Sequence, residues 1–526
     1  MSWKCNLCTH IYDESKESIQ WDNLMEEWVC PICGSSKQSF TEIKEIKEDI
    51  IQESHKEFLS RLECKLCSFV FDEAKEKKLW SESKDIFRCP VCGSDQSSFS
   101  NLAPLRKTPL KSDSVSIEED YLAEWEKPYD EFESHMADIH KMSVTGRSIS
   151  EPMRTQNPTF SWDDILFKGA QLAKIPFNKS HPIKTQTIIG PGADHPMIIE
   201  TPIFVTHMSF GALSKEAKIA MSKGSAKLKT AIGSGEGGIL PESFDASYRY
   251  IFEYVPNRYS VTDENLKKVD AVEIKFGQSA KPGMGGHLPG HKVTREIAEI
   301  RGFREGQDIT SPSSFTEIRN KDDLKKMVDS IRAKTGGKPV GIKLAAGHIE
   351  EDIKIALFAG VDFITIDGRA GGTGSALKVV KNASSVPTIF ALARARKALD
   401  KMDGKNVSLI ITGGLRVSSD FAKALAMGAD AIALGTTVMM ALGCQQYRIC
   451  DTGKCPVGIA TQDPALRARF NIDQSAKRVA NYFKVSTEEL KDFARLSGND
   501  NVHLLSERDI FTTNSEISNH TNINHV

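Results

Sequence analysis

Cysteines form the clearest chemical pattern in this sequence of 526 residues, which contains 11 of them. Eight lie in two copies of one arrangement, in which two Cys-x2-Cys pairs are separated by 21 residues. The ligand candidates are Cys5, Cys8, Cys30 and Cys33 in the first copy and Cys64, Cys67, Cys89 and Cys92 in the second. Two converging pairs place four thiolates in a tetrahedron, which suits Zn²⁺ or a single iron ion. The odd total fits metal ligation in a reducing compartment better than a disulfide framework.

The two copies are an internal duplication, because every cysteine recurs 59 residues later and the flanking residues repeat. Tyr12-Asp13 corresponds to Phe71-Asp72, and Phe40 corresponds to Phe99. With the Cys-Pro-x-Cys-Gly turns, these residues resemble rubredoxin, whose single iron carries one electron at a time. The resemblance implies two rubredoxin-like domains, at 1–45 and 60–104. Structural zinc remains an alternative to iron, because Thr9 and Ser68 replace the usual glycine and the loop between the pairs is short.

The last three cysteines are Cys444, Cys450 and Cys455, and Pro-Val-Gly follows the third. They lie too close together for two tetrahedral pairs, but three thiolates suit an iron-sulfur cluster that lacks one corner. Plain buried cysteines are disfavoured, because the surrounding sequence is hydrophilic. From about Asp163 to Phe470 the sequence resembles the synthase domain of glutamate synthase. That resemblance implies a 3Fe-4S cluster on these three cysteines.

Glycine-rich loops follow several apolar runs, and in a parallel barrel such loops bind phosphate groups. The glutamate synthase resemblance implies that the bound group is FMN. It places Met208, Ser209 and Gln278 near the flavin ring and assigns further contacts to Gly371, Gly372, Thr373, Gly413, Gly414, Gly435 and Thr436. Lys343 would lie near flavin N1, where a cation stabilises the anionic reduced flavin.

A loop rich in Gly and Pro, residues 281–293, carries several cations that suit the binding of a carboxylate. The resemblance implies that Lys281 and Arg301 bind 2-oxoglutarate there. His287 stands in place of a substrate-binding Gln, and Met284 in place of a common Glu, so the identity of the acid stays open. Glu236 matches an acidic residue near the substrate that accepts a proton or orients the amine. The expected catalytic residues are therefore Glu236, Lys281 and Lys343.

The elements that position these residues alternate between strand and helix. Apolar runs predict buried strands at Pro202–Val205, Ala271–Phe276, Val340–Leu344, Phe363–Asp367, Ser408–Gly413 and Ala431–Gly435. Helices are predicted at Lys215–Leu228, Lys321–Lys334, Ile349–Ala359 and Ser418–Met427. The alternation predicts an α/β fold of the TIM-type (β/α)8 class preceded by the two tetrathiolate domains, with a doubly wound sheet as the alternative.

The remaining organisation follows from composition. Residues 41–58 read as a charged helical connector, 105–160 as linker and lead-in, and 161–472 as the barrel with its cluster loop. Residues 473–526 are expected to form a C-terminal helix (Ala476–Leu496) and a disordered tail from Thr512. With 68 Lys+Arg against 70 Asp+Glu, nucleic acid is an unfavourable partner. No apolar run approaches the ~20 residues of a membrane span, so a cytoplasmic protein is expected.

The resemblance implies reductive amination of 2-oxoglutarate, through 2-iminoglutarate, to L-glutamate. Electrons would pass singly through iron centres to FMN. Because all eleven cysteines have metal roles, none remains for glutamine hydrolysis. Ammonia would be free or come from a separate amidotransferase subunit, or another amine would serve. No convincing dinucleotide fingerprint is present, so an electron-donor protein is expected. The alternatives are a methylglutamate synthase-like or oxidative FMN enzyme, and a zinc-ribbon adaptor with a non-catalytic barrel.

Overall fold

The computed structural model describes residues 2–5, 11–13, 21–25, 28–29, 36–43, 61–65, 69–72, 80, 87–89, 93–101, 121–127 and 129–526. The chain divides into two compact units, Met1–Phe58 and Leu59–Val526. The described residues between 2 and 43 are called module 1, and those between 61 and 101 are called module 2. Most of the connector expected at 41–58 lies outside the described residues.

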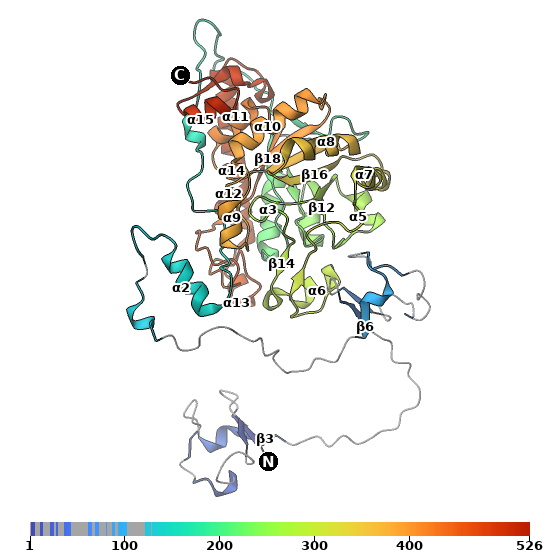
Figure 1. Ribbon diagram of the computed structural model, residues 1–526, viewed down its shortest axis with the longest axis vertical. Helices are drawn as coiled ribbons and strands as arrows, with labels where there is room; N and C mark the ends of the chain where they lie inside the picture. Colours follow the sequence, from blue (N-terminus) through green and yellow to red (C-terminus); the bar gives the residue numbers. More distant parts are fainter. Residues whose placement is uncertain are drawn as a thin grey trace. The chain divides into compact units, whose positions relative to one another are not determined.

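Each module is a small three-stranded antiparallel sheet with the first strand in the centre (Figure 1). Module 1 contains β1 (Ser2–Cys5), β2 (Ile11–Asp13) and β3 (Phe40–Ile43), and module 2 contains β4 (Arg61–Cys64), β5 (Val70–Asp72) and β6 (Phe99–Asn101). The registers are equivalent, because Cys5 pairs with Phe40 and Cys64 pairs with Phe99. The duplication read from the cysteines is therefore a duplication of the fold.

The aromatic cores of the modules repeat in the same way. In module 1 the Trp21 ring lies 5.3 Å from Tyr12 and 5.0 Å from Phe40. In module 2 the Trp80 ring lies 5.0 Å from Phe71 and 4.9 Å from Phe99. Cys64 and Cys89 are buried beside this second cluster. The other candidate ligands Cys8, Cys30, Cys33, Cys67 and Cys92 lie outside the described residues.

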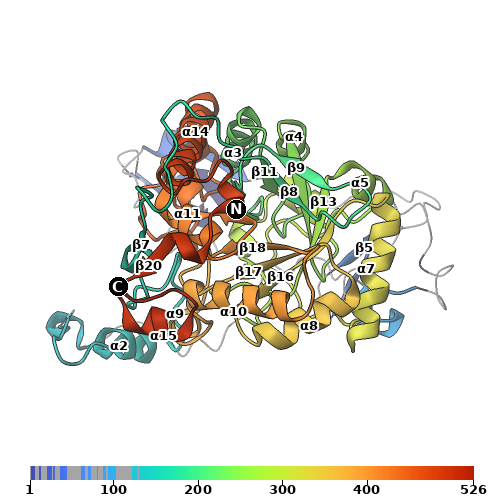
Figure 2. The same ribbon diagram turned by 90° about the horizontal axis from the view of Figure 1, so that it is seen from above.

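The predicted barrel is confirmed, because eight parallel strands close on themselves. They are β10 (Ile203–Val205), β11 (Ala231–Gly233), β12 (Arg249–Tyr254), β13 (Ala271–Lys275), β16 (Val340–Ala345), β17 (Phe363–Asp367), β18 (Ser408–Thr412) and β19 (Ala431–Leu434). The helices outside them include α3 (Lys215–Lys227), α4 (Pro241–Asp245), α5 (Asp263–Lys268), α6 (Arg295–Arg301), α7 (Lys321–Thr335), α8 (Ile349–Ala359), α9 (Lys378–Ala383), α10 (Thr388–Lys401), α11 (Ser418–Ala426) and α12 (Thr436–Leu442). Figure 2 shows helices arranged around the strands.

Local sequence explains these elements. β17 is buried along its whole length and consists of Phe-Ile-Thr-Ile-Asp, which suits a strand covered on both faces. The side chain of Ser214 caps α3, and Asn320 caps α7, which ends at Gly336 with a φ of 73°. Six of the eight barrel strands match the predicted runs. The sequence reading missed β11, which has three residues, and β12, whose Arg and Glu hide its apolar pattern.

Short elements complete the fold. The hairpin of β8 (Thr187–Ile189) and β9 (Met197–Ile199) buries Ile189, Met197 and Ile199 against the barrel residues Phe204 and Ile251. β14 (His287–Leu288) pairs with β15 (Ile309–Thr310) in the segment between β13 and β16. α2 (Met136–Thr145) lies in the expected lead-in, and α13 (Pro464–Arg467) precedes the C-terminal helix.

The predicted disorder of the C-terminal tail is wrong. α14 (Ile472–Leu496) packs against α3, and β20 (Ile510–Thr512) pairs with β7 (Ile165–Phe167). α15 (Ser515–His520) follows, and Ile517 and Ile523 are 0% and 1% exposed. Burial of a few apolar side chains therefore outweighs the polar composition of the tail. Among the described residues no helix is long and apolar enough to cross a membrane.

Candidate active site

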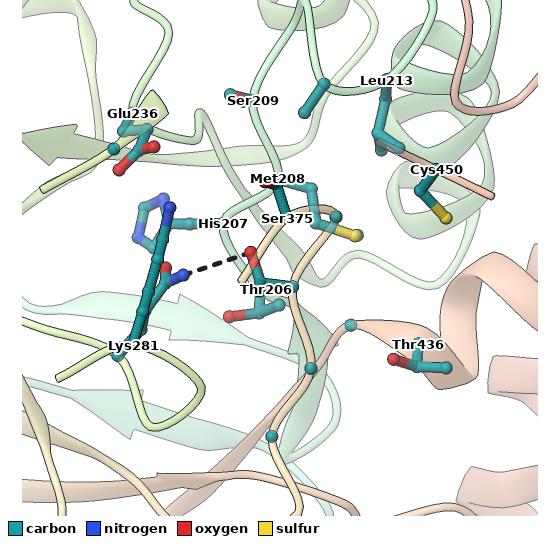
Figure 3. Close-up of a pocket in the computed structure, with 18 of the residues that line it drawn as sticks. Thr206, His207, Met208, Ser209, Leu213, Glu236, Lys281, Ser375, Thr436 and Cys450 are labelled. Atoms are coloured by element: carbon teal, nitrogen blue, oxygen red, sulfur yellow. Dashed lines mark hydrogen bonds between the residues drawn. The ribbon is translucent and has the colours of Figure 1, made fainter. Parts of the chain in front are cut away.

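A large pocket opens at the carboxyl ends of the barrel strands. Parallel strands bring their carboxyl ends to one rim, and residues far apart in sequence meet there. The pocket is lined by residues that follow β10, β11, β13, β17, β18 and β19, and by Lys343 from within β16. It brings together all the predicted flavin contacts, namely Met208, Ser209, Gln278, Lys343, Gly371, Gly372, Thr373, Gly413, Gly414, Gly435 and Thr436. Figure 3 shows Glu236, Lys281 and His207 on one side of Met208, with Cys450 and Thr436 away from them.

The glycine loops on the β17 to β19 side are too tightly packed for side chains. A Cβ at Gly413, where φ is 114°, would lie 2.4 Å from the Gly368 carbonyl oxygen. A Cβ at Gly414, where φ is 93°, would lie 2.6 Å from the Ala370 Cβ. These two glycines therefore allow the backbone itself to form the wall of the pocket. Exposed backbone beside the start of α12 is a chemical environment that suits a phosphate, so the loops fit the phosphate end of FMN.

A strap formed by residues 149–157 crosses the same side of the pocket. The Met153 amide donates to the Thr373 carbonyl at 2.7 Å, and Glu151 donates to Ala376 at 2.8 Å. The buried ammonium of Lys381 donates to the carbonyl of Glu151 at 2.9 Å and pairs with its carboxylate. Met153 of this strap, which belongs to the expected lead-in, lines the pocket.

The opposite end of the pocket is a buried group of charged side chains. Lys275 Nζ lies 2.5 Å from Glu236 Oε2 and 3.8 Å from Glu253 Oε1. Lys281 and Arg301 line the same end and are 8% and 6% exposed. Arg301 donates to the Phe210 carbonyl at 2.7 Å. Three cations thus surround one carboxylate where little water is present to screen them.

These neighbours set the ionisation of Glu236. Burial alone would raise its pKa, but the charges of Lys275, Lys281 and Arg301 lower it to about 2. Burial opposes the charge of Lys275 as well, yet Glu236 and Glu253 raise its pKa. The pKa of Lys281 is lowered by burial and by Lys275. Glu236 is therefore an anion at neutral pH, which suits holding a cation better than accepting a proton.

A second buried group lies behind the first and joins three strands. His207 Nε2 lies 3.0 Å from Glu273 Oε2, and His207 Nδ1 accepts from the Gly235 amide at 3.2 Å. The ligand atoms of His207, Glu253 and Glu273 all lie within 4.8 Å of one another. A metal ion is disfavoured there, because the ammonium groups of Lys275 and Lys343 lie 3.8 and 3.9 Å from Glu253. We assign this group to the electrostatic support of the pocket.

The substrate residues predicted from the sequence occupy different environments. Lys281 and Arg301 lie inside the pocket, whereas the His287 side chain is 45% exposed at its edge. His287 Nε2 lies 2.8 Å from Asp308 Oδ2, and Met284 is 42% exposed. His287 and Met284, which depart from the glutamate synthase pattern, thus lie at the outer part of the loop. There they affect the access of substrate to the pocket more than they affect its buried charges.

The three late cysteines gather beside the strap and the pocket. The Cys450 sulfur lies 3.8 Å from the sulfur of Met153, and the Cys444 sulfur accepts from Gln446 at 3.3 Å. Burial and the nearby Cys444 and Cys455 raise the pKa of Cys450 to about 11, although Lys292 opposes the shift. Three cysteine side chains in one partly buried loop fit an iron-sulfur cluster, whose positive irons would hold the sulfurs as thiolates.

The sequence reading missed several residues that line the pocket, and the buried Glu273 beside His207: the pocket residues are His207, Glu253, Lys275, Lys292 and Asp367. The strand Val272-Glu-Ile-Lys275 carries two charges within a buried strand, which was the available signal. Lys275 pairs in register with Lys343, the residue that the sequence reading did identify. Lys292 donates to the Cys450 carbonyl and so links the substrate loop to the cysteine loop.

Replacing Glu236 with glutamine is expected to remove a pH-dependent part of the stability. The carboxyl group has a pKa of about 2 in the folded chain and an ordinary value of 4.5, so its ionisation stabilises the fold above pH 4.5. This contribution is lost as the pH falls from 4.5 towards 2. At neutral pH the free energy of unfolding of the variant should be roughly 2 to 3 kcal/mol lower than that of the parent. Urea unfolding should show that the difference in free energy of unfolding between the parent and the variant becomes smaller as the pH falls from 4.5 towards 2. A difference that does not change with pH would contradict the lowered pKa of Glu236.

Comparison with known families identifies the barrel. The model described as "Conserved region in glutamate synthase" matches residues 135–500, which is more than half of the chain. The chain belongs to the glutamate synthase family. The expectation of an oxidoreductase acting on CH-NH2 donors is confirmed at the level of this family. The rubredoxin model matches residues 2–40, which cover module 1 up to the first residue of β3.

Related proteins of this family cover different parts of the chain. A protein of Methanocaldococcus jannaschii, named archaeal glutamate synthase (NADPH), is 40% identical over 61% of this chain and 63% of its own length. One from Thermotoga maritima, named archaeal-type glutamate synthase (NADPH), is 32% identical over 81% of this chain and 87% of its own. A glutamate synthase large subunit-like protein of Rhizobium meliloti is 33% identical over 71% and 89%. The lactate oxidase of Pediococcus acidilactici has a TM-score of 0.42 and 17% identity over 65% of this chain and 81% of its own, too little for an argument.

Proposed function

We propose that this chain makes L-glutamate from 2-oxoglutarate and ammonia by reducing the 2-imino acid that the two form. The observation that carries the proposal is the pocket itself, in which glycine loops face a buried end that contains Lys275, Lys281 and Arg301. One end suits the phosphate of FMN, and the other suits a substrate with two carboxylates. When bound, FMN supplies the hydride that reduces the imine carbon.

The protein side chains bind and orient the reactants. Lys281 and Arg301 hold the carboxylates, because each cation is buried and directed into the pocket. Glu236, which stays ionised, orients the incoming ammonia or its ammonium form near the carbonyl carbon. Lys343 stabilises negative charge on the reduced cofactor. Its position inside the barrel, 4% exposed, excludes water that would screen this charge.

The iron centres are proposed as the path for electrons. The sulfurs of Cys444, Cys450 and Cys455 would hold a 3Fe-4S cluster beside the pocket, where Cys450 forms part of its lining. The tetrathiolate sites would hold iron, with zinc as the alternative. Although some relatives are named for NADPH, we propose that a one-electron donor protein supplies the electrons, and that free ammonia or a separate amidotransferase subunit supplies the nitrogen.

The test is a turnover assay on protein purified without oxygen, together with flavin and metal analysis. Protein reduced by dithionite should convert 2-oxoglutarate and ammonium to glutamate, which is measured by mass spectrometry with ¹⁵N-ammonium. Glutamine in place of ammonium should give little product. Colourless protein with stoichiometric zinc would contradict the redox proposal. Flavin bleaching by an amino or hydroxy acid without glutamate formation would favour the oxidative alternative.

A further inference from the structure

Module 2 belongs to the same compact unit as the barrel, whereas module 1 is a unit of its own. Two close approaches mark the contact of module 2 with the barrel. A Cβ placed on Gly302 would lie 3.5 Å from the Phe69 ring of module 2. A Cβ placed on Gly93 of module 2 would lie 3.2 Å from the Thr316 hydroxyl. Both contacts join residues more than 200 positions apart, so they reflect tertiary packing.

These contacts identify the face of module 2 that meets the barrel. Phe69 lies two residues after the pair Cys64-x2-Cys67, and Gly93 directly follows the pair Cys89-x2-Cys92. In a tetrathiolate module the two Cys-x2-Cys turns surround the metal. The barrel therefore contacts module 2 at its metal end and not at the far end of its sheet.

The barrel surface below this contact is also a wall of the pocket. Gly302 closes α6 with a φ of 72° and directly follows Arg301, whose side chain lines the pocket. Tyr259 and Phe303 are buried in one cluster with Phe210, the residue whose carbonyl accepts from Arg301. Gly302, which contacts Phe69, is thus the direct neighbour of a residue that lines the charged end of the pocket.

Arg258 adds a fixed positive charge at this surface. It lies in the loop after β12 and pairs with Glu317, the neighbour of Thr316. Thr316 approaches Gly93, whose amide donates to the Cys89 carbonyl at 2.9 Å. A fixed cation at this surface lowers the energy of a tetrathiolate site that gains negative charge when iron is reduced.

We propose that module 2 is docked by its metal end on the surface formed by Arg258, Gly302 and Thr316, and that electrons reach the barrel through this module. Each step takes one electron: a donor protein reduces ferric iron in module 2, and the ferrous iron passes the electron on to the flavin site. Two such steps supply the two electrons of one turnover. The route depends on the proposed function, whereas the docking and the effect of Arg258 do not.

The sequence differences between the modules support this assignment. Module 1 has His10, Val29 and Ser36 at the positions of Phe69, Arg88 and Asp95 in module 2. The apolar ring of Phe69 suits contact with Gly302, which has no side chain. An imidazole at this position, as in His10, would lose its hydrogen bonds to water in the contact, and this loss costs free energy. The duplicated modules therefore differ at the residue through which module 2 contacts Gly302 of the barrel.

The first test measures the redox potential of module 2. In a chain that carries Cys5→Ala and Cys8→Ala, iron of the rubredoxin type is confined to module 2. Arg258→Gln should lower the midpoint potential of this iron, so that the ferrous-to-ferric ratio at a fixed potential falls about five-fold. Arg258→Lys retains the charge and should retain the potential. Equal potentials in the glutamine variant and its parent, or zinc in module 2, would overturn the proposal.

The second test measures docking by hydrogen exchange in the full chain. Thr316→Arg places a bulky side chain against Gly93 without changing module 2, whereas Phe69 also packs within its own module. Amide exchange around Cys89–Ser98 and Arg258–Ser260 should become about ten-fold faster in this variant. Ser180→Arg, at another exposed position, is the matched control. Unchanged exchange would overturn the docking, and neither test depends on glutamate formation.

Discussion

Replacing Lys275 with methionine is expected to lower the free energy of unfolding by about 3 to 5 kcal/mol, the usual result of breaking a buried ion pair. Glu236 and Glu253 would keep their buried negative charges but lose the ammonium that lies 2.5 and 3.8 Å from them. The methionine side chain matches the apolar part of lysine in length. The loss therefore reports the weakened pairing of the two carboxylates and not a cavity.

The measurement is urea unfolding at neutral pH, followed by tryptophan fluorescence. Lys326→Met is the matched control, because its side chain is 79% exposed on α7 and should change the stability little. The double variant Lys275→Met with Glu236→Gln should regain part of the loss. If the double variant is as unstable as Lys275→Met alone, the ion pair between Lys275 and Glu236 does not contribute to the stability as we expect.

Replacing Lys343 with methionine is expected to reduce turnover by about 10² to 10³ while FMN stays bound. Lys343 is 4% exposed and lies next to Lys275 in the strand register, so its charge acts where water screens little. Without it, the reduced flavin would lose the cation that we expect beside its negative charge. The phosphate loops at Gly413 and Gly435 are unchanged by this substitution and should keep the cofactor.

Turnover driven by dithionite and a spectroscopic titration of the flavin potential measure this effect together. The potential should fall in Lys343→Met and recover largely in Lys343→Arg, which retains the charge. A loss of activity that follows only the loss of bound flavin would show a structural role for this lysine.

Local sequence identified the residues that have special chemistry or special backbone. The cysteine spacing gave the two modules, and the apolar runs gave six of the eight barrel strands. The glycine loops were recognisable because positions such as Gly413 and Gly414 adopt backbone angles that other residues rarely adopt. The predicted tail shows the limit of composition, because Ile517 and Ile523 are buried by distant parts of the fold.

Contacts between remote segments of the barrel could not be predicted from the sequence. Lys275 lay within the predicted strand Ala271–Phe276, and only the closed barrel brings it to Glu236 and Glu253. The strap at 149–157 had no periodic pattern of apolar residues in the sequence. It is not a helix or a strand, because its backbone forms hydrogen bonds with the loop at 373–376 and not within itself. Contacts of this kind depend on side chains that meet through folding, over separations that local propensity does not constrain.

The sequence by itself determined which residues can bind metal, turn sharply or form buried strands, since these properties follow from each side chain and its near neighbours. Only the tertiary structure decided which charges are buried together and which part of the barrel surface module 2 contacts. The physical reason is that the ionisation of Glu236 and the docking of Phe69 depend on the distance to groups supplied by remote segments.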